Sequence, residues 1–258
     1  MTQMTLVTGG TGTLGAHFVP LLRAAGSEVR VLTRHARPSE DGVQYVACDL
    51  LAEDDAPLRA ALDGVDVVVH LAGGPKGDDV ATAHLVRAAA AAKIRHLVLI
   101  SVIGADVVPI GYFQRKLTSE QVVERSGVPY TILRAAQFHD LALFTAQKMA
   151  KLPVLPAPGG ARWQPVDSRD VAARLVELTL GEPAGMVADM AGPSVYPLDG
   201  LVRDYLRASG KRRPRLPIHV PGKAGKVYRS GRNLTLSGAT LGTRTWEEFL
   251  AEHVSAKG

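Results

Sequence analysis

The chain has 258 residues, a hydrophobic content of 46% and a formal net charge of +5. These values allow one large α/β domain, or one with a smaller appended lobe, and they exclude an intrinsically disordered chain. No run approaches the ~18 apolar residues that span a bilayer, and MTQMTLV has no signal-peptide features. We therefore expect a soluble, cytoplasmic protein. The single cysteine, Cys48, excludes an intrachain disulfide and is expected to be a small buried residue.

The positive charge is concentrated in one segment of the sequence. Residues 201–232 hold ten of the 30 Lys and Arg residues but only one of the 25 acids, Asp204. A solvated surface is the simplest explanation, and an anionic ligand, a protein partner or nucleic acid are the alternatives. The Gly and Pro residues of this segment and its lack of helix-turn-helix spacing disfavour DNA binding.

The N-terminal stretch LVTGGTGTLG predicts a dinucleotide-binding turn. An apolar strand over 5–8 leads into glycines that satisfy both GxxGxxG and GxGxxG, and a helix is predicted over 13–25. One glycine permits a positive φ, one lets the backbone approach the pyrophosphate, and one lets the helix pack on the strand. The helix N-terminus would direct its free N–H groups at the phosphates. The predicted cofactor contacts here are Gly9, Thr11, Gly12, Thr13, Leu14 and Gly15.

Strands and helices then alternate along the chain. The pattern predicts strands over 28–33, 44–48, 65–71, 94–101 and 128–134, and helices over 54–62, 78–92 and 112–126. This alternation predicts a Rossmann-type α/β fold with a doubly wound parallel sheet. From residue 151 the chain is rich in Pro and Gly, with helices expected over 168–180, 198–209 and at TWEEFL. We predict an NAD(P)-binding core over 1–150 and a segment over 151–258 that completes the core and forms a smaller substrate lobe.

The residues after the second strand indicate which cofactor is bound. The tip carries Arg34, and no carboxylate follows until Glu40. A carboxylate at this point would bind the ribose 2′-hydroxyl of NAD, whereas a guanidinium can bind a 2′-phosphate. The sequence therefore predicts NADP(H) over NAD(H). Further predicted cofactor contacts at strand ends are Asp49, which could equally cap the following turn, and Leu50, Ala72 and Gly73.

Candidate catalytic residues follow the fifth strand. Tyr112 and Lys116 are four residues apart and share one helical face, and Ser101 lies at the carboxyl end of the strand. Tyr112 would donate a proton to a carbonyl oxygen as hydride arrives. Lys116 would bind the nicotinamide ribose and lower the pKa of the tyrosine, while Ser101 would hold the substrate oxygen.

Aromatic residues after the sixth strand are candidates for the substrate pocket. Phe138, His139 and Phe144 would form its wall, although aromatic residues at such positions are also common in cores. His139 is an alternative proton donor. Trp163 would either face the substrate or anchor its Pro- and Gly-rich loop. No His and Cys spacing indicates a metal site.

The motifs TGGTGTLG, HLAGG, IS, YFQRK and VPYTILRAAQF together resemble the short-chain dehydrogenase/reductase superfamily, and within it the NmrA-like NAD(P)-binding branch. The resemblance implies a Rossmann-type domain, dinucleotide binding and a Ser/Tyr/Lys site at Ser101, Tyr112 and Lys116. Members of this branch also include quinone reductases that transfer hydride directly, without the tyrosine, and proteins that only sense dinucleotides.

These observations predict an NADPH-dependent oxidoreductase that acts on a small carbonyl or quinone compound. The alternatives are a non-catalytic NAD(P)-binding regulator of the NmrA type and a sugar-nucleotide epimerase or dehydratase. We expect a monomer or a homodimer, with a small-molecule substrate and no membrane or nucleic-acid partner.

Overall fold

The computed structural model describes residues 3–74 and 76–254, and these residues divide into two compact units. Unit 1 comprises Met1–Ser101, Gly111–Leu133 and Ala172–Val187. Unit 2 comprises Val102–Ile110, Arg134–Val171 and Ala188–Gly258. The chain therefore passes between the units several times. The predicted organisation into a core over 1–150 and a lobe over 151–258 stays a prediction.

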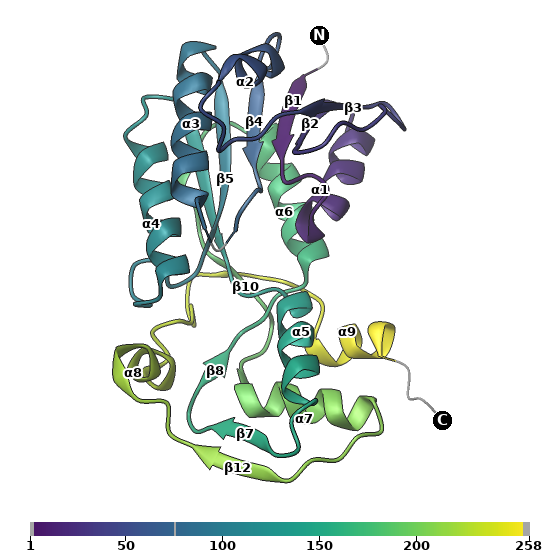
Figure 1. Ribbon diagram of the computed structural model, residues 1–258, viewed down its shortest axis with the longest axis vertical. Coiled ribbons are helices and arrows are strands. Elements are labelled where there is room, and N and C mark those ends of the chain that lie inside the picture. The colour runs from purple at the N-terminus through teal and green to yellow at the C-terminus, as the bar shows by residue number, and fades with distance from the viewer. Residues whose placement is uncertain (1–2, 75, 255–258) are drawn as a thin grey trace. The chain divides into compact units, whose positions relative to one another are not determined.

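Unit 1 is built on a parallel sheet of strands in the order β3-β2-β1-β4-β5-β6 (Figure 1). This is the strand order of dinucleotide-binding folds, with the order reversing between β1 and β4. A short strand, β9 (Gly185–Met186), pairs with β6. The strands are β1 (Met4–Thr8), β2 (Glu28–Thr33), β3 (Val43–Ala47), β4 (Val67–His70), β5 (His96–Val102) and β6 (Tyr130–Ala135).

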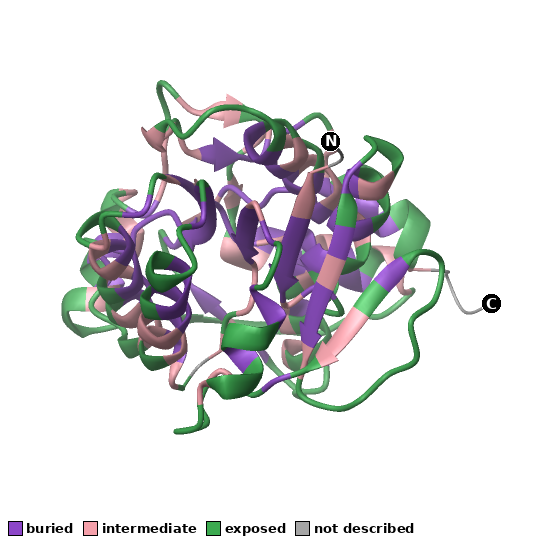
Figure 2. Cartoon of the chain, turned by 90° about the horizontal axis from the view of Figure 1, so that it is seen from above, coloured by how far each residue is buried: buried purple, intermediate pink, exposed green. Residues whose placement is uncertain are grey.

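The central strands are buried on both faces, as their apolar sequences require. Every residue of β4 and β5 is buried, and Figure 2 shows the buried residues running along the sheet. Leu6, Val68 and Leu97 pack in one cluster with Leu85 and Val123 from the covering helices. The helices of this part of the chain are α1 (Thr13–Ala24), α2 (Ala56–Ala61), α3 (Asp78–Ala91), α4 (Gly111–Glu124) and α6 (Ser168–Leu180).

The predicted Rossmann-type α/β fold with a parallel sheet is confirmed. The predicted bounds of β2 and α6 match the structure, and the other predicted elements of the alternating region lie within a few residues of the observed ones. Cys48 is buried, as expected of a small apolar side chain. Among the described residues, no helix has the length and apolar character needed to cross a membrane.

Unit 2 contains short strands and a second hydrophobic core. Strand β10 (Met190–Ala191) pairs with Ala135 at the end of β6 and with β13 (Thr240–Leu241). The core joins Ala146, Leu201 and Trp246, which come from three different helices. The remaining elements are α5 (His139–Met149), α7 (Leu198–Ala208), α8 (Gly222–Ser230), α9 (Trp246–His253), β7 (Leu155–Pro158) paired with β12 (Arg215–Ile218), and β8 (Arg162–Trp163) paired with β11 (Tyr196–Pro197).

Sequence patterns did not predict α5 and α8. In α5 the buried residues are His139, Ala142 and Ala146. Leu143 and Met149 pack on the core only partly buried and Phe144 is 55% exposed, so large apolar residues mark the core side weakly. In α8 the glycines resemble helix breakers. A Cβ on Gly225 would lie only 2.0 Å from the Val220 carbonyl oxygen, so this glycine permits a close backbone approach inside the helix.

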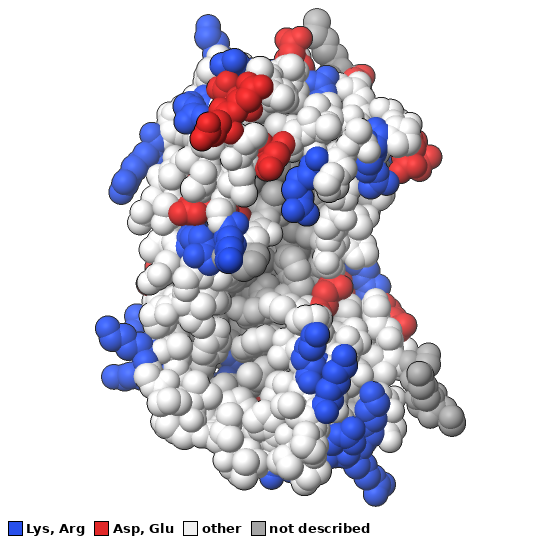
Figure 3. Space-filling view, in the orientation of Figure 1, with Lys and Arg blue, Asp and Glu red and all other residues white. Residues whose placement is uncertain are grey.

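The basic segment 201–232 comprises most of α7 and all of β12 and α8. Its residues from 210 to 222 are all exposed, and Figure 3 shows Lys and Arg side chains gathered over the end of α7 and the loop towards β12. A solvated surface, the simplest of the predicted explanations, agrees with this exposure.

Helix α9 depends on its N-terminal cap. Thr245 Oγ1 accepts a hydrogen bond from Glu248 N at 3.3 Å, and Glu248 Oε2 accepts one from Thr245 N at 2.8 Å. We expect Thr245→Ala to lower the free energy of unfolding of unit 2 by about 1 kcal/mol, because the cap hydrogen bond is lost. Urea unfolding and amide exchange in α9 would measure this effect. Thr245→Ser is the control, and equal stability of the two variants would contradict the prediction.

Candidate active site

The glycine-rich turn after β1 has a geometry that larger residues would disrupt. Gly9 has φ +70°, and a Cβ placed on it would lie 2.5 Å from Ala72 N. A Cβ on Gly15 would lie 2.3 Å from the Gly9 carbonyl oxygen. Gly12 N donates to that same oxygen at 3.0 Å and closes the turn. The glycines therefore serve the turn and the close packing of α1 that their spacing predicted.

The N-terminus of α1 is open to an anion. Its N-cap residue is Gly12, no side chain caps the helix, and no acid lies in its first turn. Thr11, Gly12 and Thr13 are exposed, whereas Leu14 and Gly15 are buried. Unpaired N–H groups and the positive end of the helix dipole favour a phosphate here. The residues present thus fit the pyrophosphate of a dinucleotide.

The loop after β4 lies next to this turn. Strands β1 and β4 are parallel neighbours, and Ala72 N donates to Thr8 Oγ1 at 3.1 Å. Ala72 is half-buried and Gly73 is exposed. The structure therefore brings the predicted cofactor residues of both loops to one edge of the sheet.

The tip of β2 carries two arginines with different surroundings. Arg34 is exposed, and none of the other described residues forms a hydrogen bond or ion pair with it. Arg37 is held by Glu40 at 3.0 Å, and its guanidinium lies 4.7 Å from the centre of the Tyr45 ring. Arg34 is thus the cation of this tip that is available to an anionic ligand.

The end of β3 gives a mixed result for the adenine contacts. Asp49 Oδ1 accepts a hydrogen bond from Leu51 N at 3.0 Å, so its exposed side chain caps the turn, the alternative that the sequence left open. The half-buried Leu50 uses its carbonyl oxygen to bind His84 Nδ1 at 2.9 Å. A direct role of Asp49 at adenine stays a prediction.

Lys116 and Tyr112 lie on one face of α4, and Lys116 is deeply buried. Its ammonium lies 3.1 Å from Asp78 Oδ2, with only 4% and 3% of the two side chains exposed. Lys116 Nζ also donates to the Ile100 carbonyl oxygen at 3.4 Å. A Cβ on Gly73 would lie 3.0 Å from this nitrogen, so the ion pair directly underlies the β4 loop. Asp78 was not among the predicted site residues.

The prediction that Lys116 lowers the pKa of Tyr112 is wrong. Partial burial raises the pKa of Tyr112 above its ordinary value, and the negative charge of Asp78 raises this pKa further. Asp78 balances the ammonium that would otherwise favour the phenolate. Tyr112 is therefore a neutral phenol at neutral pH.

Ser101 occupies the predicted place at the end of β5, but its hydroxyl is already engaged. Ser101 Oγ donates to Glu120 Oε1 at 2.5 Å, and both residues are buried. Glu120 lies one helical turn beyond Lys116 on α4. A contact between Ser101 and a substrate oxygen would have to compete with this carboxylate.

A buried hydrogen-bonded chain links the β4 loop to the start of α3. Thr8 Oγ1 lies 2.6 Å from His70 Nδ1, His70 Nε2 lies 3.1 Å from Thr82 Oγ1, and Thr82 Oγ1 donates to the Asp78 carbonyl oxygen at 2.7 Å. Burial lowers the pKa of His70 to about 3, and the nearby Lys116 charge lowers it as well. His70 is therefore neutral, and the chain is consistent when Nε2 carries the proton.

The candidate substrate residues belong to unit 2 and differ in their accessibility. Phe138 is half-buried and forms a bridge to Val166, and Phe144 is exposed. Trp163 is half-buried, pairs with Tyr196 and packs on the core of unit 2, which favours its role as an anchor. The sequence left both roles of Trp163 open, and contact with a substrate stays a prediction.

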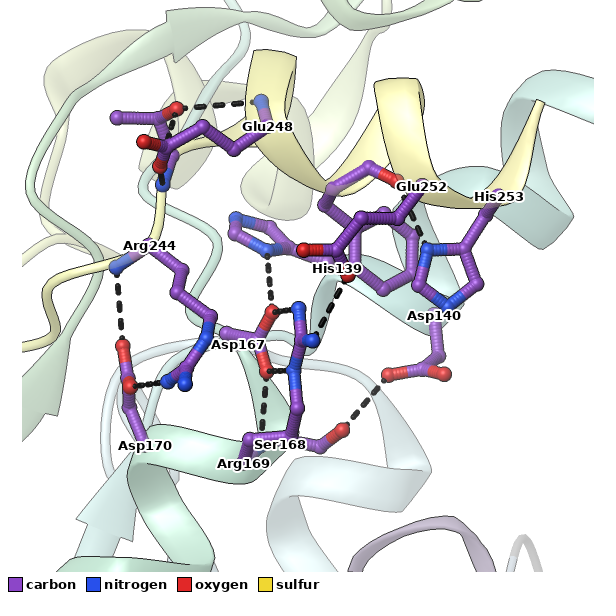
Figure 4. A network of polar contacts seen from close by, with 12 residues as sticks. His139, Asp140, Asp167, Ser168, Arg169, Asp170, Arg244, Glu248, Glu252 and His253 are labelled. Atoms are coloured by element: carbon purple, nitrogen blue, oxygen red, sulfur yellow. Dashed lines mark hydrogen bonds and ion pairs between the residues drawn. The ribbon is translucent and has the colours of Figure 1, made fainter. Parts of the chain in front are cut away.

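The predicted role of His139 as a substrate contact or proton donor is corrected by its burial. Its side chain is 0% exposed, and its ring lies 5.8 Å from the Trp246 ring and 5.2 Å from the Phe249 ring. Its Nδ1 lies 3.7 Å from Asp167 Oδ2. Figure 4 shows the His139 ring pointing toward Asp167 within the polar network. His139 is thus a core residue of unit 2.

Asp167 is the centre of this polar network. Arg169 binds it through Nε and Nη2 at 2.8 and 2.7 Å, and Arg169 Nη1 continues to Glu252 at 2.7 Å (Figure 4). Burial opposes the ionisation of Asp167. Hydrogen bonds from Arg169, together with the nearby His139 ring, outweigh that effect and hold the pKa of Asp167 well below its usual range. The same bonds raise the pKa of Arg169.

One sequence signal could have located Glu120, which the sequence analysis missed. Phe113, Lys116, Ser119, Glu120 and Val123 form the buried face of α4, so charged residues occupy positions that the helical period assigns to the core. A Lys and a Glu at such positions require buried partners. The partner Asp78 sits at the start of α3, 38 residues away, where no local pattern indicates the pairing.

Comparison with known proteins agrees with this geometry. Residues 9–180 match the NAD(P)H-binding family. The chain belongs to this family. The matched region contains the glycine turn, the Arg34 tip and the Tyr112 and Lys116 pair.

Two similar proteins are reductases from bacteria. A (4-alkanoyl-5-oxo-2,5-dihydrofuran-3-yl)methyl phosphate reductase of Streptomyces griseus is 36% identical over 184 residues, covering 69% of this chain and 64% of the relative. An NAD(P)H azoreductase of Xenophilus azovorans is 33% identical over 184 residues, covering 67% and 62%. The matches therefore span less than two thirds of the length of these relatives.

A solved structure extends the comparison over the whole fold. The NADPH-dependent quinone oxidoreductase of Escherichia coli, complexed with NADPH, has a TM-score of 0.81 at 21% identity, covering 96% of this chain and 99% of that protein. At this identity the likeness supports the Rossmann-type fold.

The Asp167 network predicts an acid-sensitive contribution to stability. The pKa of Asp167 in the folded protein is below the value of about 3.9 for an unfolded chain. Its stabilisation is therefore complete above that value and is lost as the pH falls below it. We expect Asp167→Asn to lower the free energy of unfolding by about 3 kcal/mol at pH 7, because it removes one partner of a buried ion pair.

Urea unfolding between pH 2 and pH 7 would measure this contribution. The difference between wild type and Asp167→Asn should shrink only below about pH 4. Glu252→Gln is the control, because the side chain of Glu252 is 49% exposed and its ion pair should contribute less than about 1 kcal/mol. A difference that is independent of pH would contradict the assignment.

Proposed function

We propose that the protein is an NADPH-dependent oxidoreductase of the NmrA-like branch of the short-chain dehydrogenases and reductases, acting on a small carbonyl or quinone compound. One observation carries the proposal: Lys116, one helical turn after Tyr112 on α4, lies at the Gly73 loop, and this loop adjoins an uncapped, glycine-rich helix N-terminus. A proton donor beside a dinucleotide site is the arrangement that carbonyl reduction requires. The names of the two reductase relatives support this reaction class.

Particular residues would hold the cofactor. The N–H groups of Thr13 to Gly15 at the start of α1 would bind the pyrophosphate, with Thr11 and Gly12 beside it. Arg34 would bind the 2′-phosphate, which is our reason for preferring NADPH to NADH. Asp49, Leu50, Ala72 and Gly73 would line the remaining path along the strand ends. The bound cofactor would supply hydride to the substrate.

The chain would supply the proton. Tyr112 would donate the proton of its neutral phenol to the substrate oxygen, and solvent would restore it. Lys116 would fix the ribose through its ammonium. Contact of Phe138 or Trp163 with the substrate stays a prediction. We expect the protein to work in the cytoplasm as a monomer or a homodimer.

Transfer of hydride without a protein proton donor is the second candidate. The hydrogen bond from Ser101 to Glu120 favours it, because the serine hydroxyl is then not available to hold a carbonyl oxygen. A quinone depends less than a carbonyl on protonation during hydride transfer, because the oxygen of the reduced quinone is a stabilised phenolate. The two candidates differ in their dependence on Tyr112.

Substitution of Tyr112 separates these candidates. For a carbonyl acceptor, we expect Tyr112→Phe to lower kcat about 100-fold or more, because the proton donor is lost. The measurement is NADPH oxidation by both proteins against a panel of quinones and activated carbonyls. Undiminished turnover of quinones would support direct hydride transfer. Tight NADPH binding by wild type without any turnover would instead indicate a dinucleotide sensor and contradict the enzyme proposal.

Cofactor preference is expected to depend on Arg34. Arg34→Ala should raise the Kd for NADPH about tenfold or more and leave that for NADH unchanged, because only NADPH carries the 2′-phosphate. Titration of both cofactors by fluorescence or calorimetry would measure the difference. Arg37→Ala is the matched control, because Arg37 is already bound to Glu40. A larger effect of Arg37→Ala would refute the assignment of Arg34.

A further inference from the structure

The buried pair of Asp78 and Lys116 lies one helical turn from Tyr112, the candidate proton donor. Lys116 Nζ lies 3.1 Å from Asp78 Oδ2, and only 4% of the lysine side chain and 3% of the aspartate side chain are exposed. Tyr112 lies one turn before Lys116 on α4, and α4 packs directly on α3, which carries Asp78. Tyr112 is therefore one helical turn from a lysine whose charge is already balanced.

The position of Asp78 is fixed from several directions. Its carbonyl oxygen accepts from Thr82 at 2.7 Å, at the end of the chain that runs through His70 and Thr8 to Ala72 N. A Cβ on Gly73 would lie 3.4 Å from Asp78 Oδ1. The carboxylate is therefore held against the loop that carries the predicted cofactor contacts.

Few other titratable groups surround the phenol in unit 1. His70 on β4 is neutral, and Glu120 on α4 accepts the Ser101 hydroxyl. Arg115 is a half-buried neighbour on α4, and Asp79 is a half-buried neighbour of Asp78 on α3. Among the charged groups, Asp78 is the one that acts together with burial to raise the pKa of Tyr112.

We propose that Asp78 is a positioning residue of the proton-donor site: it fixes Lys116 and balances its charge, so that Tyr112 works as a neutral proton donor. The inference rests on the proposed function. In reduction, a hydride forms the new C–H bond, the carbonyl π electrons move to oxygen, and Tyr112 supplies the O–H proton. The reverse reaction needs an ionised Tyr112 to take the proton of an alcohol while an oxidised nicotinamide cofactor accepts the hydride.

Asp78→Asn tests the inference, because it keeps the shape of the side chain and removes its charge. We expect the pKa of Tyr112 to fall in this variant, since the lysine charge is then unbalanced. The measurement is a pH titration of 13Cζ-tyrosine NMR signals in the cofactor-free protein, with the Tyr112 signal assigned by Tyr112→Phe. Asp79→Asn is the matched control and Asp78→Glu is the conservative variant. Both should leave the pKa of Tyr112 high.

Kinetics give the second measurement. With an alcohol and carbonyl pair that wild type interconverts, we expect Asp78→Asn to lower by about one unit the pH at which alcohol oxidation gains activity, because ionised Tyr112 then forms at lower pH. The alkaline limb of the reduction profile should move to lower pH. Asp79→Asn should change neither quantity.

The titration separates the two proposals, because it needs neither cofactor nor turnover. If Tyr112 of the wild type titrates at or below the ordinary value of about 10, the inference fails even where Asp78→Asn does not fold. An unchanged pKa in Asp78→Asn, or an equal fall in Asp79→Asn, would also overturn it. A lowered pKa in a protein that reduces nothing would leave the electrostatic role of Asp78 standing and refute only the oxidoreductase.

Discussion

The ion pair between Lys116 and Asp78 is the constraint on which the candidate site depends. Two charges that are almost fully removed from water are stable only when each retains its partner, because an unpaired buried charge costs several kcal/mol. Helices α3 and α4 must therefore stay packed, and the Ile100 carbonyl of β5 must stay within reach of the ammonium. The loop at Gly73 has to pass directly over the pair, which a side chain at that position would obstruct.

The parallel sheet supplies the fixed frame that this pair requires. Most side chains of β1, β4 and β5 are apolar, but each strand has a polar residue at or next to its carboxyl end. These residues are Thr8, His70 and Ser101. Carboxyl ends of parallel strands meet at one edge of the sheet, so these groups gather beside the glycine turn. Buried hydrogen bonds then connect the turn, the β4 loop and the start of α3 into one arrangement with few alternatives.

Sequence alone predicted the frame and part of the site. Glycine spacing located the turn, and continuous apolar runs located the central strands, because both are local patterns that backbone sterics and burial impose. The sequence did not predict the roles of Asp78 and His70, because their partners are distant in the sequence. The pKa of Tyr112 was misjudged for the same reason, since the spacing of Tyr112 and Lys116 contains no information on the carboxylate that opposes the lysine. Helix α5 was missed because alanines form its buried face.

Charges in this protein separate into paired and available ones, and the distinction bears on binding. Lys116 and Arg169 are bound to carboxylates, so their charges fix neighbouring groups in place. Arg37 is likewise bound to Glu40. Arg34 is exposed and has no such partner among the described residues. An incoming phosphate gains more from a cation that is not already neutralised, because no existing bond must be broken. We therefore expect Arg34 to recognise a 2′-phosphate, and we expect the buried pair of Asp78 and Lys116 to influence how the phenol of Tyr112 reacts.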